Sequence, residues 1–487
     1  MTKEVLKVAA AAAAGIIAVL VIALWATPAR QILDDPASRI VLRPEATDHS
    51  NLFKTEKFET GQEVTLACLE CHPDAAREVM ATQHWNWLGA EEYLPGRDQP
   101  VRIGKKNLIN NFCISVISNW PKCTSCHAGY GWEDEKFDFT QAKNVDCLVC
   151  HDQSGQYVKG AAGQPADDVD LLASAKSVGR PTRDNCGYCH FNGGGGDAVK
   201  HGDLDGSLAK PVERVDVHMG RENFDCIICH RTEDHKIPGK MISVSATDTL
   251  GLTCNECHTP MPHRSDRLND HISAVACQSC HIPSMARRTP TKVAWDWSTA
   301  GQDVDVEDPH KYLKVKGSFV YAKNLPPEYY WFNGNSDRYL MGDRIDPEKV
   351  THLNYPMGNI SDPGAKIFPF KVHRAKQPYD TENNYLLVPK TVGKGGFWDE
   401  FDWNKSFELA EELTGLEYSG SYGFAETDMY WLITHMVAPK DDSLQCADCH
   451  GESGRMDWAA LGYGSDPAFT GGRQFRRILS RAQGGQR

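Results

Sequence analysis

Eight short motifs of cysteine and histidine constrain this chain more than any other feature of its sequence. Sixteen of its 17 cysteines fall into Cys-x-x-Cys-His units, where chance would give on the order of a few hundredths of one unit. Zinc sites and redox-active Cys-x-x-Cys pairs do not require a histidine after the second cysteine eight times over. The units are Cys68/Cys71/His72, Cys123/Cys126/His127, Cys147/Cys150/His151, Cys186/Cys189/His190, Cys226/Cys229/His230, Cys254/Cys257/His258, Cys277/Cys280/His281 and Cys446/Cys449/His450.

This spacing is the one that attaches haem covalently. Two thiols one helical turn apart can each form a thioether with a haem vinyl group, and the adjacent histidine then ligates the iron. We therefore expect eight covalent haems c, with the histidine of each unit as proximal ligand. Seven units lie within residues 68–281. The chain between them is too short for an ordinary apolar core, so the haems supply the buried surface and lie close enough to pass electrons.

The order of the units predicts a mainly α fold, with short helices and loops wrapped around eight haems and longer helices toward the C-terminus. Residues 30–290 form the haem-dense domain, and residues 291–450 an aromatic-rich and helical region ending in the eighth unit. Residues 451–487 follow as a C-terminal tail. In the helical region, Trp403–Leu413 is amphipathic, and Thr427–Val437 is largely apolar and ends before a proline.

The N-terminus predicts export. Lys3 and Lys7 precede an uncharged apolar run from Val8 to Trp25, within a segment 1–29 that is either a cleaved signal peptide or a retained membrane anchor. Both alternatives place the rest of the chain in the periplasm, where the anchored form would be held at the inner membrane. The formal net charge of −13 argues against nucleic acid as a partner. Residues 471–487 carry five arginines and no acid, as in a solvated tail or a contact with a membrane surface or partner.

Nineteen histidines less the eight in the units leave eleven that could bind the other face of an iron. A haem with strong ligands on both faces only transfers electrons, whereas a weak or missing distal ligand permits chemistry. Two candidates have expected positions: His84 at the end of a helix begun at Pro73, and His435 on the helix leading into the eighth unit. The candidate distal ligands are His84, His218, His235, His263, His271, His435 and His49, with His201 and His373 behind them. His310 and His352 are expected not to bind haem.

At this level the sequence resembles the octahaem tetrathionate reductases, relatives of hydroxylamine oxidoreductase. The resemblance runs from about His49 to His450. Its most specific stretches are Asn-Leu-Ile-Asn-Asn-Phe-Cys at 107–113, Cys-Thr-Ser-Cys-His-Ala-Gly-Tyr-Gly-Trp at 123–132, and the glycine-rich segment at 186–203. Octahaem nitrite reductases, with a Cys-x-x-Cys-Lys unit, and octahaem sulfite reductases, with one widely spaced unit, fit less well because all eight units here are regular.

The resemblance implies a catalytic haem at the second unit. In that family a lysine outside the binding units is the distal ligand, which implies His127 as the proximal and Lys200 as the distal ligand here. Asn110, Cys113 and Asp197 would line the cavity. Ligation of iron by a lysine near pH 7 costs roughly 4–5 kcal/mol for loss of its proton, so such a ligand is displaced more easily than imidazole. The released ammonium could then hold an anion, and Asp197, one helical turn away, could orient it or relay protons.

These inferences together predict a periplasmic multihaem oxidoreductase. A quinol-linked donor or a soluble cytochrome would supply electrons, and a small inorganic substrate would be reduced at the second haem. The resemblance favours tetrathionate, reduced to thiosulfate, with nitrite or hydroxylamine as the enzymatic alternative. The alternative from another class is an electron-transfer conduit without catalysis, in which every haem has two histidine ligands. The four glycines at 193–196 lack the Gly-Lys-Ser/Thr of a phosphate loop and are expected to let the backbone pass a porphyrin face.

Overall fold

The computed structural model describes residues 36–40, 46–112, 115–239, 242 and 251–473. Its contacts divide the chain into two compact units: Met1–Leu42 with Thr253–Asn269, and Arg43–Leu252 with Asp270–Arg487. The predicted export segment 1–29, Cys113 and most of the arginine-rich end lie outside the described residues. Within the described ranges, no helix has the length and apolar character needed to cross a membrane.

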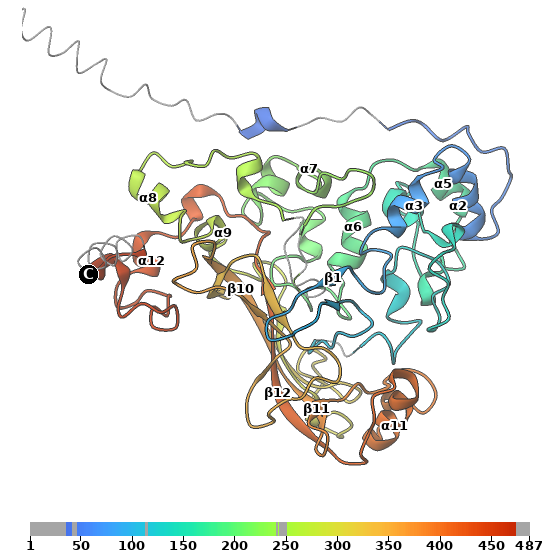
Figure 1. Cartoon of the computed structure of the whole chain (residues 1–487). Coiled ribbons are helices and arrows are strands. Elements are labelled where there is room, and N and C mark those ends of the chain that lie inside the picture. Colours follow the sequence, from blue (N-terminus) through green and yellow to red (C-terminus); the bar gives the residue numbers. More distant parts are fainter. Residues whose placement is uncertain (1–35, 41–45, 113–114, 240–241, 243–250, 474–487) are drawn as a thin grey trace, which may run out of the picture. The chain divides into compact units, whose positions relative to one another are not determined.

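Short helices joined by irregular loops make up the region rich in Cys-x-x-Cys-His units, as the sequence predicts (Figure 1). The longest is α2, which begins where the Thr60 side chain accepts a hydrogen bond from the amide of Glu63. The α-helices up to residue 281 are α2 (Gly61–Leu69), α3 (Ala75–Met80), α4 (Leu148–His151), α5 (Leu171–Lys176), α6 (Arg183–His190), α7 (Cys226–Cys229), α8 (Asp266–His271) and α9 (Cys277–His281). Single tighter turns lie at Pro36–Arg39, Thr124–Cys126, Ala142–Asn144, Ala161–Gly163, Gly206–Leu208 and Cys254–Glu256, and a π-helical turn at Val217–Arg221.

A β-sheet of eight strands follows this region. Its strands run in the order β4-β5-β3-β10-β12-β8, and β6 and β11 also pair with β10. The long antiparallel pair β10 and β12 crosses the middle of Figure 1, with α9 near one end and α11 near the other. The sheet contains β3 (Thr291–Asp296), β4 (Tyr312–Leu313), β5 (Gly317–Ala322), β6 (Glu328–Phe332), β8 (Thr351–His352), β10 (Lys366–Asp380), β11 (Tyr385–Leu386) and β12 (Tyr422–Leu432). Two small pairs are β1 (Glu91–Glu92) with β2 (Val101–Arg102), and β7 (Ser336–Arg338) with β9 (Asn354–Pro356).

The sheet corrects the prediction of a mainly α fold. The segment Thr427–Val437, predicted as a helix, instead completes β12 and leaves the sheet after Leu432. Residues of β12 from Asp428 to Trp431 are buried on both sides, and such a strand shows a continuous apolar run that periodicity cannot separate from a buried helix. His435 therefore lies beyond a strand rather than on a helix. His84 likewise lies beyond α3, which ends at Met80.

The amphipathic prediction at Trp403–Leu413 is confirmed by α11 (Trp403–Thr414). The Asp402 side chain caps its first turn by accepting from the amide of Lys405, and Gly415 ends it with φ 70°, a left-handed conformation that suits glycine. Trp403 and Phe407, one turn apart, are buried against the sheet. The remaining helices are α10 (Phe397–Glu400), α12 (Cys446–Cys449) and α13 (Pro467–Thr470), with short turns at Trp297–Thr299 and Lys440–Asp442.

Residues 451–473 pack against β6 and the start of β10. Leu461 and Tyr463 join a buried cluster with Trp331 of β6, and the Trp331 indole donates to the carbonyl of Leu461 at 2.8 Å. The Arg473 guanidinium donates to the carbonyls of Ala365 at 2.7 Å and Ser273 at 2.6 Å. This segment therefore fixes the eighth unit, which directly precedes it, against the sheet.

We expect Phe407→Ala to lower the free energy of unfolding by about 3–5 kcal/mol, because a buried aromatic ring leaves a cavity when truncated. Phe407 is 1% exposed and packs between Trp403 and Tyr418. Denaturant unfolding, followed by tryptophan fluorescence, measures the change. The exposed neighbour Glu408, changed to Ala, is the matched control and should stay near wild type. Equal stability of the two variants would contradict the packing assigned to α11.

Candidate cofactor-binding and catalytic site

Six of the eight Cys-x-x-Cys-His units have both cysteines in a helical turn or at its N-cap, which places the two thiols one turn apart. In the first, third, fifth, sixth and eighth units, the histidine amide donates to the carbonyl of the first cysteine at 2.8–3.1 Å. In the second unit the amide of His127 donates instead to Thr124 at 3.0 Å, which closes a tighter turn.

The second cysteines of the first and sixth units, Cys71 and Cys257, depart from the helical placement that the sequence predicts. Both α2 and the tight turn of the sixth unit end before the second cysteine, so these two residues lie just beyond a helical element, which corrects that expectation. The amides of Cys71 and Cys257 still donate to the carbonyls of Cys68 and Cys254, each at 3.2 Å. The chain therefore continues to turn at both units and keeps the cysteines of each close together. Attachment of haem to Cys71 and Cys257 stays a prediction.

Five unit histidines face a second histidine ring at nearly one distance. An imidazole nitrogen binds a metal at about 2 Å and the ring centre lies about 1 Å further, so two rings on one ion have centres about 6 Å apart. The structure matches this spacing, although the five pairs draw on distant segments. The pairs are His49–His72 at 6.3 Å, His84–His190 at 6.1 Å, His151–His235 at 6.4 Å, His230–His435 at 6.4 Å and His271–His450 at 6.3 Å.

Hydrogen bonds donated by Nδ1–H orient most of these rings. A ligating histidine usually donates a hydrogen bond from its second ring nitrogen to a carboxylate or carbonyl oxygen, which fixes the ring and leaves Nε2 for the metal. His235 bonds Glu78 at 2.8 Å and His450 bonds Asp466 at 2.6 Å. The others with such a bond are His49 to Thr47 O at 2.7 Å, His151 to Gly179 O at 2.8 Å, His230 to Pro238 O at 2.7 Å and His435 to Asp203 at 3.3 Å. The residues present therefore fit haem iron at these positions.

The other histidines occupy different surroundings. His218 stacks on Phe224, with ring centres 6.0 Å apart. His258 and His263 belong to the smaller compact unit, where the amide of His263 bonds the side chain of Asn269. His201 is partly buried against Trp431 of β12, and His373 is buried within β10. The two expected non-ligands have carboxylate neighbours: His310 lies near Asp308, and His352 bonds Asp428 at 2.6 Å.

Units far apart in the sequence are neighbours in space. Thiols of different units contact one another in the pairs Cys68 with Cys147, Cys126 with Cys189, and Cys186 with Cys226. The third and fourth units are joined by a bond from Asn185 to the carbonyl of Asp152 at 2.9 Å. The segment after His435 bonds the carbonyls of His281 and Cys280, linking the fifth, seventh and eighth units. Seven units thus form one connected series, in which the second branches from the fourth.

The second unit departs from this pattern. Its His127 ring packs against four aromatic rings, those of Trp85, Trp132, Phe137 and Phe139, and no histidine ring is among them. Nε2 lies 2.9 Å from the carbonyl oxygen of Trp85, an acceptor, so this nitrogen carries the proton. Burial lowers the pKa of His127 to about 4, which keeps the ring neutral.

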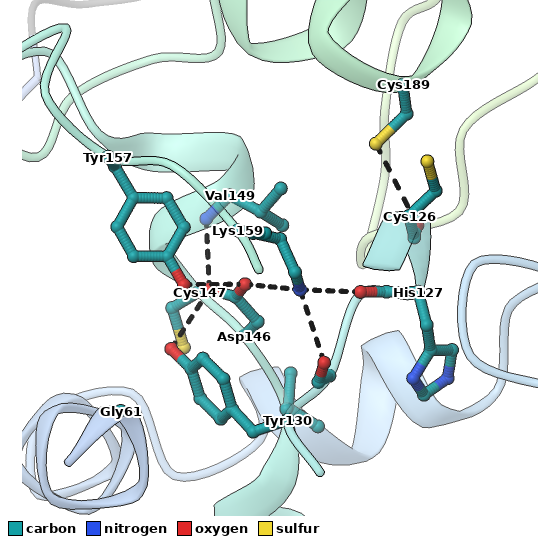
Figure 2. A network of polar contacts seen from close by, with 12 residues as sticks. Gly61, Cys126, His127, Tyr130, Asp146, Cys147, Val149, Tyr157, Lys159 and Cys189 are labelled. Atoms are coloured by element: carbon teal, nitrogen blue, oxygen red, sulfur yellow. Dashed lines mark hydrogen bonds and ion pairs between the residues drawn. The ribbon is translucent and has the colours of Figure 1, made fainter. Parts of the chain in front are cut away.

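A buried ion pair that the sequence analysis missed connects the second and third units (Figure 2). Lys159 and Asp146 are joined at 2.6 Å, and both side chains are fully buried. The Lys159 ammonium also donates to the carbonyl of His127 at 2.6 Å. The hydroxyls of Tyr130 and Tyr157 donate to the two carboxylate oxygens of Asp146 at 2.9 and 2.8 Å. The network therefore fixes the backbone of the second unit. The position of Lys159 in the sequence gives no sign of this network.

Lys200 lies close to the second and fourth units. Its aliphatic chain passes Gly193, and its Nζ lies 5.1 Å from the centre of the Trp431 ring in β12. Burial lowers the pKa of Lys200 to about 7, and the charge of Lys105 acts in the same direction. Gly194, with φ 83°, allows the turn to press against the Phe112 ring, where any side chain would collide. A neutral amine, which an iron ligand requires, is therefore accessible near pH 7.

The other predicted cavity residues have mixed positions. Asn110 is buried, and its carbonyl accepts from Gln377 of β10 at 2.9 Å. Cys113 lies outside the described residues. Asp197 is exposed and accepts a bond from the amide of Gly206 at 2.7 Å. Since Ala198 has φ 57°, no helical turn connects Asp197 to Lys200, which corrects that expectation. The structure thus places Asn110 against the sheet, whereas Asp197 closes an exposed loop by accepting the bond from Gly206.

Comparisons with known proteins agree with these features. Residues 67–152 match the family model of cytochrome c554 and c-prime, and residues 292–453 match that of bacterial cytochrome c. An octahaem cytochrome c from Shewanella oneidensis, solved as a crystal structure, is 50% identical and superposes with a TM-score of 0.81. That match covers 87% of this chain and 98% of the Shewanella chain. An uncharacterised protein of Archaeoglobus fulgidus is 26% identical over 267 residues, or 44% of this chain and 87% of its own length.

The binding units, the histidine pairs and these matches define a multihaem c-type cytochrome with covalently bound haem c. More narrowly, the chain belongs to the octahaem cytochromes c of the tetrathionate reductase type. The protein therefore has an electron-transfer or reductase role.

We expect His84→Ala to convert one haem from low spin to high spin, because it removes the ring that faces His190. Electron paramagnetic resonance of the oxidised protein measures the conversion, and haem content should not change. His310→Ala, at an exposed histidine, is the matched control. A His84→Ala spectrum identical to wild type would show that this ring binds no iron.

We expect Lys159→Met to lower the free energy of unfolding by about 3–5 kcal/mol, because it leaves the Asp146 carboxylate buried without its cation. The double variant with Asp146→Asn should recover part of this loss, since it removes the unpaired charge. Thermal unfolding of the haem-loaded proteins measures both. Additive losses in the double variant would refute the energetic coupling of the two side chains.

Proposed function

We propose that this protein is a periplasmic octahaem reductase whose small inorganic substrate is reduced at the second unit. The observation that carries the proposal is the contrast between that unit and five others. Those five present paired histidine rings, which suit electron transfer alone. The His127 ring has aromatic neighbours instead, and the amine of Lys200 lies nearby.

Distal ligation follows from the same geometry. We assign His49, His84, His235, His271 and His435 as ligands opposite the unit histidines that they face, and Lys200 as the ligand at the second haem. When bound, the haems supply redox-active iron that passes electrons singly between neighbouring units. An amine bound to iron leaves more readily than an imidazole, because protonation competes for its lone pair. The released ammonium, held beside Trp431, then attracts a negatively charged substrate.

Tetrathionate is the substrate that we propose. Two electrons break its central sulfur–sulfur bond and yield two thiosulfate ions, with no proton consumed. Both substrate and product are dianions, which suits a site of buried lysines and few acids. The family of the chain supports this choice. A quinol-linked donor or a soluble cytochrome would deliver electrons to the connected series of units, and residues 1–29 would direct export or anchor the protein at the inner membrane.

The decisive experiment is oxidation of reduced methyl viologen by the haem-loaded protein, with tetrathionate, nitrite and hydroxylamine offered separately. Saturable turnover with tetrathionate as the preferred acceptor is the expected result. Preference for nitrite or hydroxylamine would show that the protein is a reductase with a substrate other than tetrathionate. Absence of turnover with all three, although the dye reduces the haems, would make the protein an electron conduit.

We expect Lys200→Ala to lower kcat/KM by about 100-fold, as for loss of one electrostatic stabiliser, and to leave the other haem spectra intact. Lys210→Ala, at an exposed lysine ten residues away, is the control. Wild-type turnover by Lys200→Ala with every acceptor would exclude Lys200 from the site.

A further inference from the structure

The inner face of the sheet carries basic residues where an apolar surface is expected. Alternate residues of β10 point to the same face, and those at Lys371, His373 and Gln377 are buried. Lys292 of the neighbouring strand β3 is buried as well, with 3% of its surface exposed, against 0% for Lys371 and His373. Lysine is almost never fully buried unless paired, so two of them on adjacent strands require an explanation.

These lysines contact the two segments that carry the candidate site. The Lys371 ammonium donates to the carbonyls of Val199 at 3.0 Å and Lys200 at 3.1 Å, and to the hydroxyl of Thr291 at 2.5 Å. The Lys292 ammonium donates to the carbonyl of Phe112 at 3.3 Å and lies 3.4 Å from the centre of the Trp295 ring. The basic face of the sheet is therefore continuous with Lys200 on one side and with the segment Asn110–Phe112 on the other.

Buried polar atoms without partners among the described residues lie at the same place. Neither ring nitrogen of His373 has a hydrogen-bond partner within that part of the chain, and neither does Nε2 of His201 or Oδ1 of Asn111. Fully buried polar groups are nearly always bonded, so a set of orphaned ring nitrogens marks an absent partner. His373 lies on the same strand face as Lys371, two residues away, and the Asn111 amide donates to the His373 carbonyl at 2.6 Å.

Two lysines and one carboxylate, Asp203, lie at this place, and Oδ1 of Asp203 also has no partner among the described residues. The carboxylate that acts on Lys371 is Asp203, whose Oδ2 already accepts bonds from the amides of Thr434 at 2.6 Å and His435 at 2.8 Å. The hydrogen bonds of Lys371 go to carbonyl and hydroxyl oxygens, which carry no full charge. Cations in a low-dielectric interior attract an anion strongly because water does not screen them.

We propose that Lys292, Lys371 and His373 form a binding subsite for an oxygen anion beside Lys200. The anion is either the far end of a dianionic oxyanion substrate or a propionate carboxylate of an attached haem. The first alternative rests on the proposed function and extends it, since the subsite would hold one end of the substrate while Lys200 meets the other. The second makes the cluster a fixed element of haem binding.

Binding of radiolabelled sulfate to the oxidised, haem-loaded protein tests the subsite without turnover. Lys371→Met is expected to weaken sulfate binding about tenfold or more, because a buried cation is lost. Lys376→Met is the matched control, since Lys376 lies on the exposed face of the same strand. Lys292→Met is a second variant, on the side of the basic face that bonds Phe112, and it should weaken sulfate binding as well. Lys371→Arg keeps the positive charge and should retain the affinity for sulfate.

A redox titration of the same proteins separates the two sources of the anion. If the anion is a propionate, Lys371→Met lowers one haem midpoint potential and leaves sulfate affinity unchanged. If Lys371→Met and Lys292→Met match Lys376→Met in both sulfate affinity and haem potentials, the subsite is refuted. Sulfate binding that depends on Lys371 in a protein unable to reduce tetrathionate would retain the subsite and reject the proposed substrate.

Discussion

The facing of two histidine rings, at a spacing that one iron ion can bridge, is the interaction on which the rest of this structure depends. His230 belongs to the haem-rich region and His435 follows the last strand of the sheet, yet their ring centres are 6.4 Å apart. Each such pair becomes a cross-link when a metal joins it, and a cross-link between distant residues removes much of the freedom of the unfolded chain. Short helices and irregular loops can then persist without a large apolar core.

The sheet has a different role, because it holds in place the two loops that lie near the second unit. Its long strand β10 bonds the segment Asn110–Asn111, and Lys371 bonds the turn that carries Lys200. Two loops from the haem-rich region are thus fixed by one rigid element. A site placed on such an element keeps its geometry better than one built on loops alone. The buried pair of Lys159 and Asp146 fixes the opposite side, through the carbonyl of His127.

The sequence predicted the features that depend on local chemistry. The Cys-x-x-Cys-His spacing contains both the thioether geometry and the iron ligand, and histidines close to these units, such as His271, were identifiable as partners. The sheet was missed because strands buried on both faces, like β12 at Met429–Trp431, have no alternation to detect. Lys159, Lys292 and Lys371 were missed for another reason. A buried lysine is indistinguishable from a surface lysine until the tertiary contacts of its segment are known.

The contacts between thiols of different units have a consequence for assembly. Cys126 and Cys189 lie side by side in the fold, as do Cys68 and Cys147. In an oxidising compartment such thiols can form disulfides, in competition with attachment to haem. Each disulfide would disable two adjacent attachment sites at once and interrupt the series of units at that point. The order in which the cysteines are modified during biogenesis therefore decides whether the electron path is continuous.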